Sequence, residues 1–500
     1  MDFILNILHY VVIIFLVIMV FNLMILVHEW GHFLAARWRG LKVEKFQIWF
    51  GNPIWKRTYN GVQYGLGWIP AGGFVALPQM APMDAIEGGG DDREQLPPIT
   101  PLDKIIVAFA GPLFSFMLAC VFAVLVWHFG KPEYEALKTT TIGYVAKESA
   151  AAKFGLKAGD EIISVDGNPV KNFGGLVDSV RWNIIRSENN PIPFVVKREG
   201  SAEPVKIEVE AEIPKQKPGS WWSGLFRRPE LRQVGIVGKQ TPMIKDVKPH
   251  SPADEAGLKS MDQIVSVNGM TLLQLPQLSE YIGANPDKPL ELMVVRDVSP
   301  TETKTFAVTV TPRKPDVVRP SEKEKDIGKV IGVIWDQEGK REIAHPEPQV
   351  QIKEALKTMQ QTIAAISSPK SEVSTSHLSG PIGIGRVYYN LMDDPYGWLR
   401  VMWFSVVLNV NLAVMNLLPF PVLDGGHITM ALYEWIRRRP INIRILEVVQ
   451  TACVFILLGF MVFVSMKDAG DIGGGGGSAP APIEIEFLPP NQRQGTPAQP

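Results

Sequence analysis

Four long apolar runs dominate the hydropathy pattern of the chain, and polar residues are frequent between them. The runs are Phe3–Val27, Ile105–Phe129, Val401–Leu418 and Ile445–Val464. Each run is long enough to cross the hydrocarbon core of a bilayer as a helix. The pattern therefore predicts a polytopic α-helical membrane protein with four transmembrane helices.

The first run also has to be compared with a secretory signal peptide. Met1 and Asp2 supply no basic n-region, the run is too long, and no small-residue cleavage site follows it, so we interpret it as a retained first helix.

Basic residues near the ends of the runs indicate the orientation in the membrane. The inner side is marked by six Lys or Arg residues between positions 37 and 57 and by Arg437–Arg439 between the third and fourth runs. We therefore expect both termini, and the long insert between runs two and three, on the outer side of the membrane.

Composition narrows the possible functions. The 50 Lys and Arg residues balance 51 Asp and Glu residues, and no basic stretch is interleaved with aromatic residues, so nucleic acid is not an expected partner. The two cysteines, Cys120 and Cys453, both lie in apolar runs and form no CxxC motif. Any protein-bound metal must therefore use histidine and carboxylate ligands.

The insert contains an internal repeat with an offset of 102 residues. Ser149–Gly167 and Ser251–Gly269 share ten identical positions, in the order short helix, Gly-containing turn, alternating strand and DG or NG turn. The pattern is similar to the PDZ module, in which a Gly-Leu loop and a strand edge accept an extended peptide. Two duplicated β-rich domains without a ligand remain the alternative.

Two further segments follow the repeat. Ile352–Ile366 has the apolar spacing of an amphipathic helix, which would lie on the membrane or pack on the insert. Gly473–Gly477 and the Pro-rich residues after it cannot bury a core, so a disordered tail is expected there.

The sequence His28-Glu29-Trp30-Gly31-His32 is an HExxH motif at the end of the first apolar run. On a helix its spacing places both imidazoles on one face, where they can bind one Zn²⁺, and Glu29 is placed to act as the general base. Polar groups at membrane depth are costly unless they pair or bind something, so a functional site is the expected reading.

A catalytic zinc ion needs a third protein ligand, and Asp424 in NLLPFPVLDGGH is the best candidate. Pro419 and Pro421 end the third helix, so Val422–Gly426 is expected to run as irregular backbone toward a cavity. His427 could compete as a ligand, and Asn416 could donate a hydrogen bond to a developing oxyanion.

Together, these motifs resemble the site-2 protease family of intramembrane zinc metalloproteases, and in particular its bacterial branch that regulates sigma factors. The resemblance covers nearly all of the chain from Met1 to about Asp468. It implies that His28, His32 and Asp424 bind zinc, that Glu29 is the catalytic base, and that Asn416 contacts the substrate. The family often has Asn where this chain has Ser115, so the resemblance gives no support for a polar role there.

Gly61–Leu77 is similar to the membrane-reentrant β-hairpin of the family. The stretch LSGPIGI at Leu378–Ile384 also resembles the family's sequences. We expect the two strands of the hairpin to pair with each other and to leave an edge for an extended substrate. The proposed substrate-binding glycines are Gly65, Gly67, Gly72 and Gly73.

The expected organisation follows from these features. It comprises a first transmembrane helix with HExxH (1–37), a cytoplasmic loop (38–103) with the reentrant hairpin (about 61–77), a second transmembrane helix (104–129), PDZ-like domains (140–212 and 234–312), a linker with an amphipathic helix (319–397), a third transmembrane helix with NxxPxPxLDGG (398–426), a fourth (445–466), and a disordered tail (470–500).

The functional hypothesis is an intramembrane zinc metalloprotease that cleaves transmembrane segments of single-pass proteins and acts as a monomer in the bacterial inner membrane. The resemblance implies an anti-sigma factor after a first cut, or remnant signal peptides, as substrates, with the PDZ-like domains gating access. A catalytically inactive PDZ-type scaffold would leave the HExxH motif unexplained, and an intramembrane metal transporter would leave the repeats unexplained.

Overall fold

The computed structural model describes residues 2–80, 97, 99–214, 226–299, 302–319, 328–439, 443–471 and 484–492. The chain forms two compact units. The first comprises Met1–Lys131, Ala344–Thr362 and Leu378–Ala469, and the second comprises Pro132–Ile343, Ile363–His377 and Gly470–Pro500.

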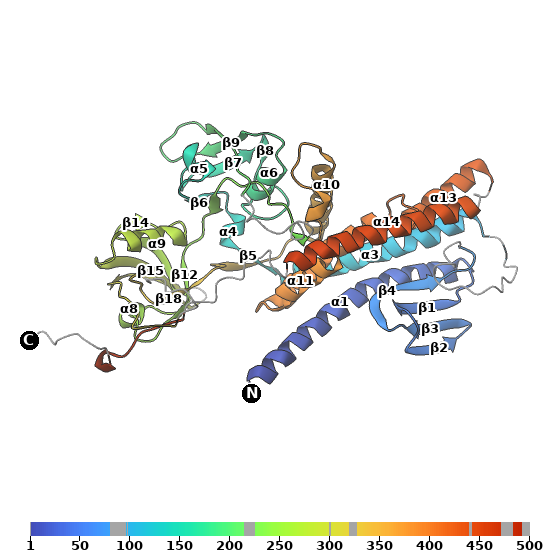
Figure 1. Ribbon diagram of the computed structural model, residues 1–500, viewed down its shortest axis with the longest axis horizontal. Coiled ribbons are helices and arrows are strands. Elements are labelled where there is room, and N and C mark those ends of the chain that lie inside the picture. Colours follow the sequence, from blue (N-terminus) through green and yellow to red (C-terminus); the bar gives the residue numbers. More distant parts are fainter. Residues whose placement is uncertain are drawn as a thin grey trace, which may run out of the picture. The chain divides into compact units, whose positions relative to one another are not determined.

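Helices make up most of the first unit (Figure 1). They are α1 (Asp2–Trp38), α3 (Pro101–Phe129), α11 (Pro381–Met392), α12 (Gly397–Asn416), α13 (Asp424–Arg437) and α14 (Ile443–Gly470), and α10 (Pro348–Ser367) begins in this unit. Among the described residues, four segments are long and apolar enough to cross a membrane: Ile7–Trp38, Pro101–Phe129, Gly397–Asn416 and Leu446–Gly470. The prediction of four transmembrane helices is confirmed.

Helix α3 is the centre of the first unit, because it packs against α1, α12 and α13. A capping box begins it: the Thr100 hydroxyl accepts a hydrogen bond from the Asp103 backbone N–H, and the Asp103 carboxylate accepts one from the Thr100 N–H. Arg39, after the end of α1, donates to the same carboxylate at 2.6 Å. The start of α3 and the end of α1 are therefore held together.

The third span is shorter than the predicted range 398–426. Helix α12 ends at Asn416, the chain is irregular from 417 to 423, and α13 begins at Asp424. The prediction of irregular backbone at Val422–Gly426 is therefore wrong for its last three residues. Gly425 and Gly426 allow the first turn of α13 to pack against the preceding loop, because an added Cβ would lie 2.2 Å from the Leu417 carbonyl oxygen and 2.1 Å from that of Phe420.

A four-stranded sheet lies beside α1, which contacts its strand β4 (Figure 1). Its strands are β1 (Lys45–Phe50), β2 (Trp55–Tyr59), β3 (Val62–Leu66) and β4 (Ile69–Ala76), in the order β2-β3-β1-β4. Strand β3 pairs in parallel with β1, and β4 pairs antiparallel with the other side of β1. The predicted pairing of the two hairpin strands with each other is therefore wrong, since Lys45–Phe50, which we had not recognised as a strand, lies between them.

The second unit contains two copies of one arrangement of strands and helices. We call residues 142–238 the first repeat domain and residues 243–336 the second. The first consists of β6 (Ile142–Val145), α5 (Ala150–Lys153), β7 (Glu161–Val165), β8 (Asn168–Pro169), α6 (Val180–Arg186), β9 (Ile192–Lys197), β10 (Val205–Val209) and β11 (Ile236–Gly238). The second consists of β12 (Met243–Val247), α8 (Pro252–Glu255), β13 (Gln263–Val267), β14 (Met270–Thr271), α9 (Leu275–Ala284), β15 (Leu290–Ser299), β16 (Glu302–Val310) and β18 (Val333–Asp336).

A buried ion pair recurs in both repeat domains. Asp160, 1% exposed, accepts two hydrogen bonds of 2.7 Å from Arg198, which also bonds the Gly155 carbonyl oxygen. Asp262, 0% exposed, accepts the same pair of bonds from Arg296 at 2.6 and 2.7 Å. The two aspartates were among the identical positions of the sequence repeat, and the two arginines lie outside that window.

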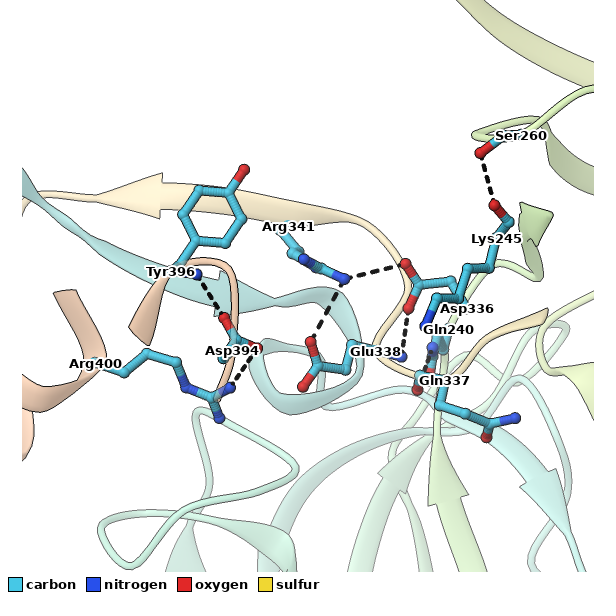
Figure 2. Close-up of polar contacts among 10 residues, drawn as sticks. All are labelled: Gln240, Lys245, Ser260, Asp336, Gln337, Glu338, Arg341, Asp394, Tyr396 and Arg400. Carbon is cyan, nitrogen blue, oxygen red and sulfur yellow. Dashed lines mark hydrogen bonds and ion pairs between the residues drawn. The ribbon is translucent and has the colours of Figure 1, made fainter. Parts of the chain in front are cut away.

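The domain boundaries differ from the predicted ones because the last strand of each repeat domain lies far along the chain. Strand β11, which we had placed in the second range (234–312), pairs with β6 of the first repeat domain. Strand β18, placed in the linker (319–397), pairs with β12 of the second. Figure 2 shows Arg341 forming ion pairs with Asp336, the last residue of β18, and with Glu338 in the turn that follows.

The remaining short elements of the second unit include β5 (Lys131–Tyr134), which pairs with β19 (Arg341–Ala344), as well as α4 (Glu135–Lys138) and a 3₁₀ turn at Thr375–His377. Helix α10 covers the range Ile352–Ile366, for which the sequence predicts an amphipathic helix. In the first unit, its Ile352 packs against residues of α3 and α12.

The sequence predicts a disordered tail at 470–500, but part of this range has regular structure. Strand β20 (Glu484–Glu486) pairs with β17 (Val317–Arg319), and a 3₁₀ turn follows at Pro490–Gln492. The predicted Gly473–Gly477 segment lies outside the described residues.

Candidate metal centre

Helix α1 places the two histidines of the HExxH motif side by side. His28 Nε2 and His32 Nε2 are 3.3 Å apart, one helical turn from each other along α1. The close crossing with α3 depends on glycines. An added Cβ at Gly31 would lie 2.5 Å from the Ala110 carbonyl oxygen, and one at Gly111 would lie 2.1 Å from His32 Nε2.

Asp424, at the start of α13, completes the cluster. Its Oδ2 lies 3.3 Å from His28 Nε2, and its Oδ1 lies 3.3 Å from His32 Nε2. The side chains of His28, His32 and Asp424 are 11%, 12% and 18% exposed, and Asp424 Oδ2 has no hydrogen-bond donor within the structure. In the part of the chain that the structure describes, these three residues are the one group placed to hold a metal ion.

The separations fit a zinc ion. Tetrahedral bonds of about 2.0–2.1 Å to nitrogen and oxygen place neighbouring ligand atoms about 3.3 Å apart. The two imidazole nitrogens are 3.3 Å apart, and each lies 3.3 Å from one of the two Asp424 carboxylate oxygens. Two imidazoles and one carboxylate also leave a fourth position open, which is the donor set of catalytic rather than structural zinc sites.

The outer nitrogen of each histidine has its own partner, which orients the ring. His28 Nδ1 lies 2.9 Å from the Ser115 hydroxyl, and His32 Nδ1 lies 2.8 Å from the Val107 carbonyl oxygen. Such contacts fix the ring so that Nε2 faces the metal position. Ser115 is 0% exposed and does have a polar role, which the sequence analysis had not supported. The signal that could have found it is its place as an isolated hydroxyl in the middle of an apolar span.

The cluster opens onto a cavity of about 250 Å³. Glu29, Asn416 and His427 line it together with Gly73, Phe74 and Val75 of β4. Asn416 Nδ2 lies 3.4 Å from His28 Nε2. Because His427 lines the cavity, it faces the same space as the cluster, but it does not belong to the group of residues placed to hold a metal ion.

The four glycines proposed to bind substrate have different places. Gly73 lines the cavity, and an added Cβ there would lie 3.4 Å from Cγ of Glu29. Gly65, Gly67 and Gly72 are not among the lining residues. An added Cβ at Gly67 would lie 2.3 Å from the Phe50 carbonyl oxygen, and Gly72 has a φ of +73° with the Phe50 ring against it. These two glycines therefore allow close packing within the sheet.

Two histidines and a carboxylate gathered within membrane-spanning and adjoining helices, with a glutamate directly after the first histidine, define a membrane-embedded metallopeptidase. Comparison with known families agrees. The chain belongs to peptidase family M50, whose model matches residues 15–460.

Named relatives are similar over nearly their whole length. The chain is 28% identical to Protease RseP of Yersinia pestis over 463 residues, which is 89% of this chain and 96% of that protein. It is 29% identical to the Regulator of sigma-E protease RseP of Salmonella typhimurium over 462 residues, with the same coverage. A Vibrio cholerae relative, 28% identical over 474 residues with the same coverage, has zinc metalloprotease in its name. The predicted class, a zinc metalloprotease of the site-2 type in a membrane, is confirmed.

Proposed function

We propose that His28, His32 and Asp424 hold the catalytic zinc ion and that Glu29 is the general base of peptide-bond hydrolysis. The observation that carries the proposal is the grouping of two imidazole nitrogens 3.3 Å apart with the Asp424 carboxylate, whose two oxygens each lie 3.3 Å from one of them, beside the cavity that Glu29 lines. Zinc bound there supplies Lewis-acid chemistry at neutral pH.

The side chains around the cavity divide the remaining work. Glu29 accepts the proton of the attacking water and returns it to the leaving amine. The Asn416 amide N–H groups donate to a carbonyl oxygen of the substrate, at the side of the cavity next to His28. Ser115 and Val107 keep both imidazole rings in place through the step.

The test is a pair of substitutions with zinc content and proteolysis measured on the same samples. Glu29→Gln should keep zinc and lose at least about 100-fold in turnover, because an amide cannot accept the proton. Asp424→Ala should lose zinc as well as activity. His427→Ala is the matched control at a residue that lines the same cavity, and it should keep zinc. Normal zinc content in Asp424→Ala would contradict the ligand assignment.

The substrate is proposed to bind as an extended strand along β4. A helical peptide hides its carbonyl groups in hydrogen bonds, so the helix must unwind before it can be cut. Strand β4 is the last strand of its sheet and lines the cavity with Gly73, Phe74 and Val75. Its second edge can pair with a substrate strand.

This binding mode predicts a dependence on substrate stability. Phe74→Pro disturbs the edge of β4 without touching the metal ligands, so zinc should remain and cleavage should fall. The loss should be smaller for a substrate whose helix is weakened by Gly or Pro near the cut. Equal losses on stable and weakened helices would leave β4 with a packing role only.

The substrates are proposed to be single-pass membrane proteins whose outer domain has already been removed, namely a trimmed anti-sigma factor or remnant signal peptides. The two repeat domains, proposed to be PDZ-like, would exclude substrates that still carry a bulky outer domain. The full-length enzyme should then cleave a short model substrate and spare the same substrate fused to a folded outer domain. Equal cleavage of both would argue against gating.

The proposed location is the bacterial inner membrane, with the protein acting as a monomer and both termini on the periplasmic side. This orientation follows from the six basic residues between 37 and 57 and from Arg437–Arg439. In intact spheroplasts, a membrane-impermeant reagent should therefore label a cysteine introduced near the C-terminus of the protein. Labelling that occurs only in inverted vesicles would contradict the orientation.

A further inference from the structure

The segment after α14 has no part in the proposed protease. It begins with a run of glycines at Gly473–Gly477 and continues with alternating Ala and Pro. Such a composition cannot build a core of its own. Yet Glu484–Glu486 forms a strand, and the apolar residues Ile485, Phe487 and Leu488 are concentrated in this short stretch.

The stretch docks on the second repeat domain through its backbone. Val317, Val318 and Arg319 of β17 are paired antiparallel with Glu486, Ile485 and Glu484. The Asp316 N–H donates to the Glu486 carbonyl oxygen at 3.1 Å, and the Leu488 N–H donates to the Asp316 carboxylate at 2.9 Å. Backbone pairing of this kind can hold an extended segment against a folded domain, and here β17 and β20 form a two-stranded sheet of their own.

One aromatic side chain anchors the strand. Phe487 is 5% exposed, and its ring lies beneath the Arg313 guanidinium, 5.1 Å from the ring centroid. The ring also lies against Gly332, where an added Cβ would be 2.9 Å from Phe487 Cε2. Arg313 is held in position because it donates to the His250 carbonyl oxygen at 2.7 Å.

The equivalent surface of the first repeat domain has its ion pair reversed, with Glu212 paired with Lys153 where the second domain has Arg313 near Glu255. Gly235, with φ +81°, takes the place of Gly332, with φ +80°. The bridge between Arg313 and Val330 corresponds to one between Glu212 and Gln233. A carboxylate therefore stands where the second domain has a guanidinium, and it cannot make the cation–π contact with a phenylalanine.

We propose that residues 484–488 are an intramolecular ligand of the second repeat domain, and that the surface they cover accepts extended peptides carrying a large aromatic side chain. That surface consists of β17, Arg313 and Gly332. In the resting protein the tail occupies it, and a peptide of similar pattern has to displace the tail. The proposal stands apart from the peptidase function, and its test does not measure proteolysis.

Hydrogen–deuterium exchange on the full-length protein in detergent tests the docking. The amides of residues 485–488 should exchange at least about tenfold more slowly than in a free peptide of the same sequence. Phe487→Ala should remove this protection and speed exchange in β17, while the β13 amides in the core stay protected. Phe154→Ala is the matched control, since it makes the same change at a side chain that is 40% exposed on the first repeat domain.

A labelled peptide of residues 480–492, added in trans, tests the surface. It should bind the Phe487→Ala chain and bind the parent chain at least about tenfold more weakly, because the tethered tail competes at high effective concentration. Free-peptide exchange rates in the parent tail, equal binding to both chains, or no binding to the variant would each overturn the proposal. Protection that falls on dilution would assign the tail to a second copy and would also overturn it.

Discussion

Gly111→Ala is the substitution that most directly tests how the metal centre is built. The added methyl group would lie 2.1 Å from His32 Nε2, whereas ordinary contact begins at 3.4 Å. The imidazole, or the whole of α3, would have to move by about 1.3 Å to relieve the overlap. Metal–ligand bonds tolerate a deviation of only about 0.2 Å, so the displacement is several times larger than the zinc site can accept.

We therefore expect Gly111→Ala to lower zinc content to the level of His32→Ala and to reduce proteolysis at least about 100-fold. The assay is metal analysis of the purified protein together with cleavage of a single-pass model substrate. Gly459→Ala is the matched control, because this glycine lies in membrane helix α14 with open space around it. Its zinc content and activity should be unchanged. Stoichiometric zinc and parental activity in Gly111→Ala would refute the view that α1 and α3 are in close contact at the site.

Three further predictions concern groups that support the site or the second unit. Ser115→Ala removes the hydroxyl that orients one metal-binding imidazole, so a chelator titration should show zinc affinity reduced about 10- to 100-fold; unchanged retention would contradict the role. Arg296→Ala leaves the carboxylate of Asp262 buried without its partner. It should lower the free energy of unfolding of the second repeat domain, measured with denaturant, by about 3–5 kcal/mol. A loss below about 1 kcal/mol, the value typical of an exposed surface ion pair, would argue against this role. The Tyr144 hydroxyl donates a hydrogen bond to Glu280 and lowers the pKa of that carboxyl. This contact between the repeat domains therefore stabilises them above the ordinary carboxyl pKa, and the stabilisation is lost as the pH falls through the lowered pKa. Energy transfer between labels on the two domains should report the loss, and a signal that stays flat with pH would contradict it.

The elements that the sequence predicted correctly are those set by local spacing. Two histidines four residues apart meet on any α-helix, so the HExxH pair needed no knowledge of the fold. Long apolar runs identified the four membrane helices for the same reason. Asp424 was predicted as a third ligand because a zinc ion held by two histidines requires another one and because a carboxylate follows the helix-breaking prolines of the third run; the structure brings it beside the histidines, and its role as a ligand stays a proposal.

The elements that were missed depend on contacts between distant segments. Lys45–Phe50 inserts between β3 and β4, and no periodicity in the Gly61–Leu77 range could indicate that. Strand β18 reaches its partner β12 from far along the chain, in a charged stretch typical of linkers. The role of Ser115 depends on the position of α3 relative to α1, which only the packed helices define.

The wide separation of the proposed zinc ligands along the chain has a consequence for synthesis. Asp424 follows His32 by 392 residues, so a nascent chain carries the histidine pair for a long time without the carboxylate. At about 5–20 residues per second, roughly 20–80 s pass between the two during translation. Throughout that interval the growing polypeptide lacks one of the three proposed ligands, so we expect it not to cleave neighbouring membrane proteins. The order of the proposed ligands in the chain thus delays activation of the enzyme until the segment with Asp424 has been synthesised.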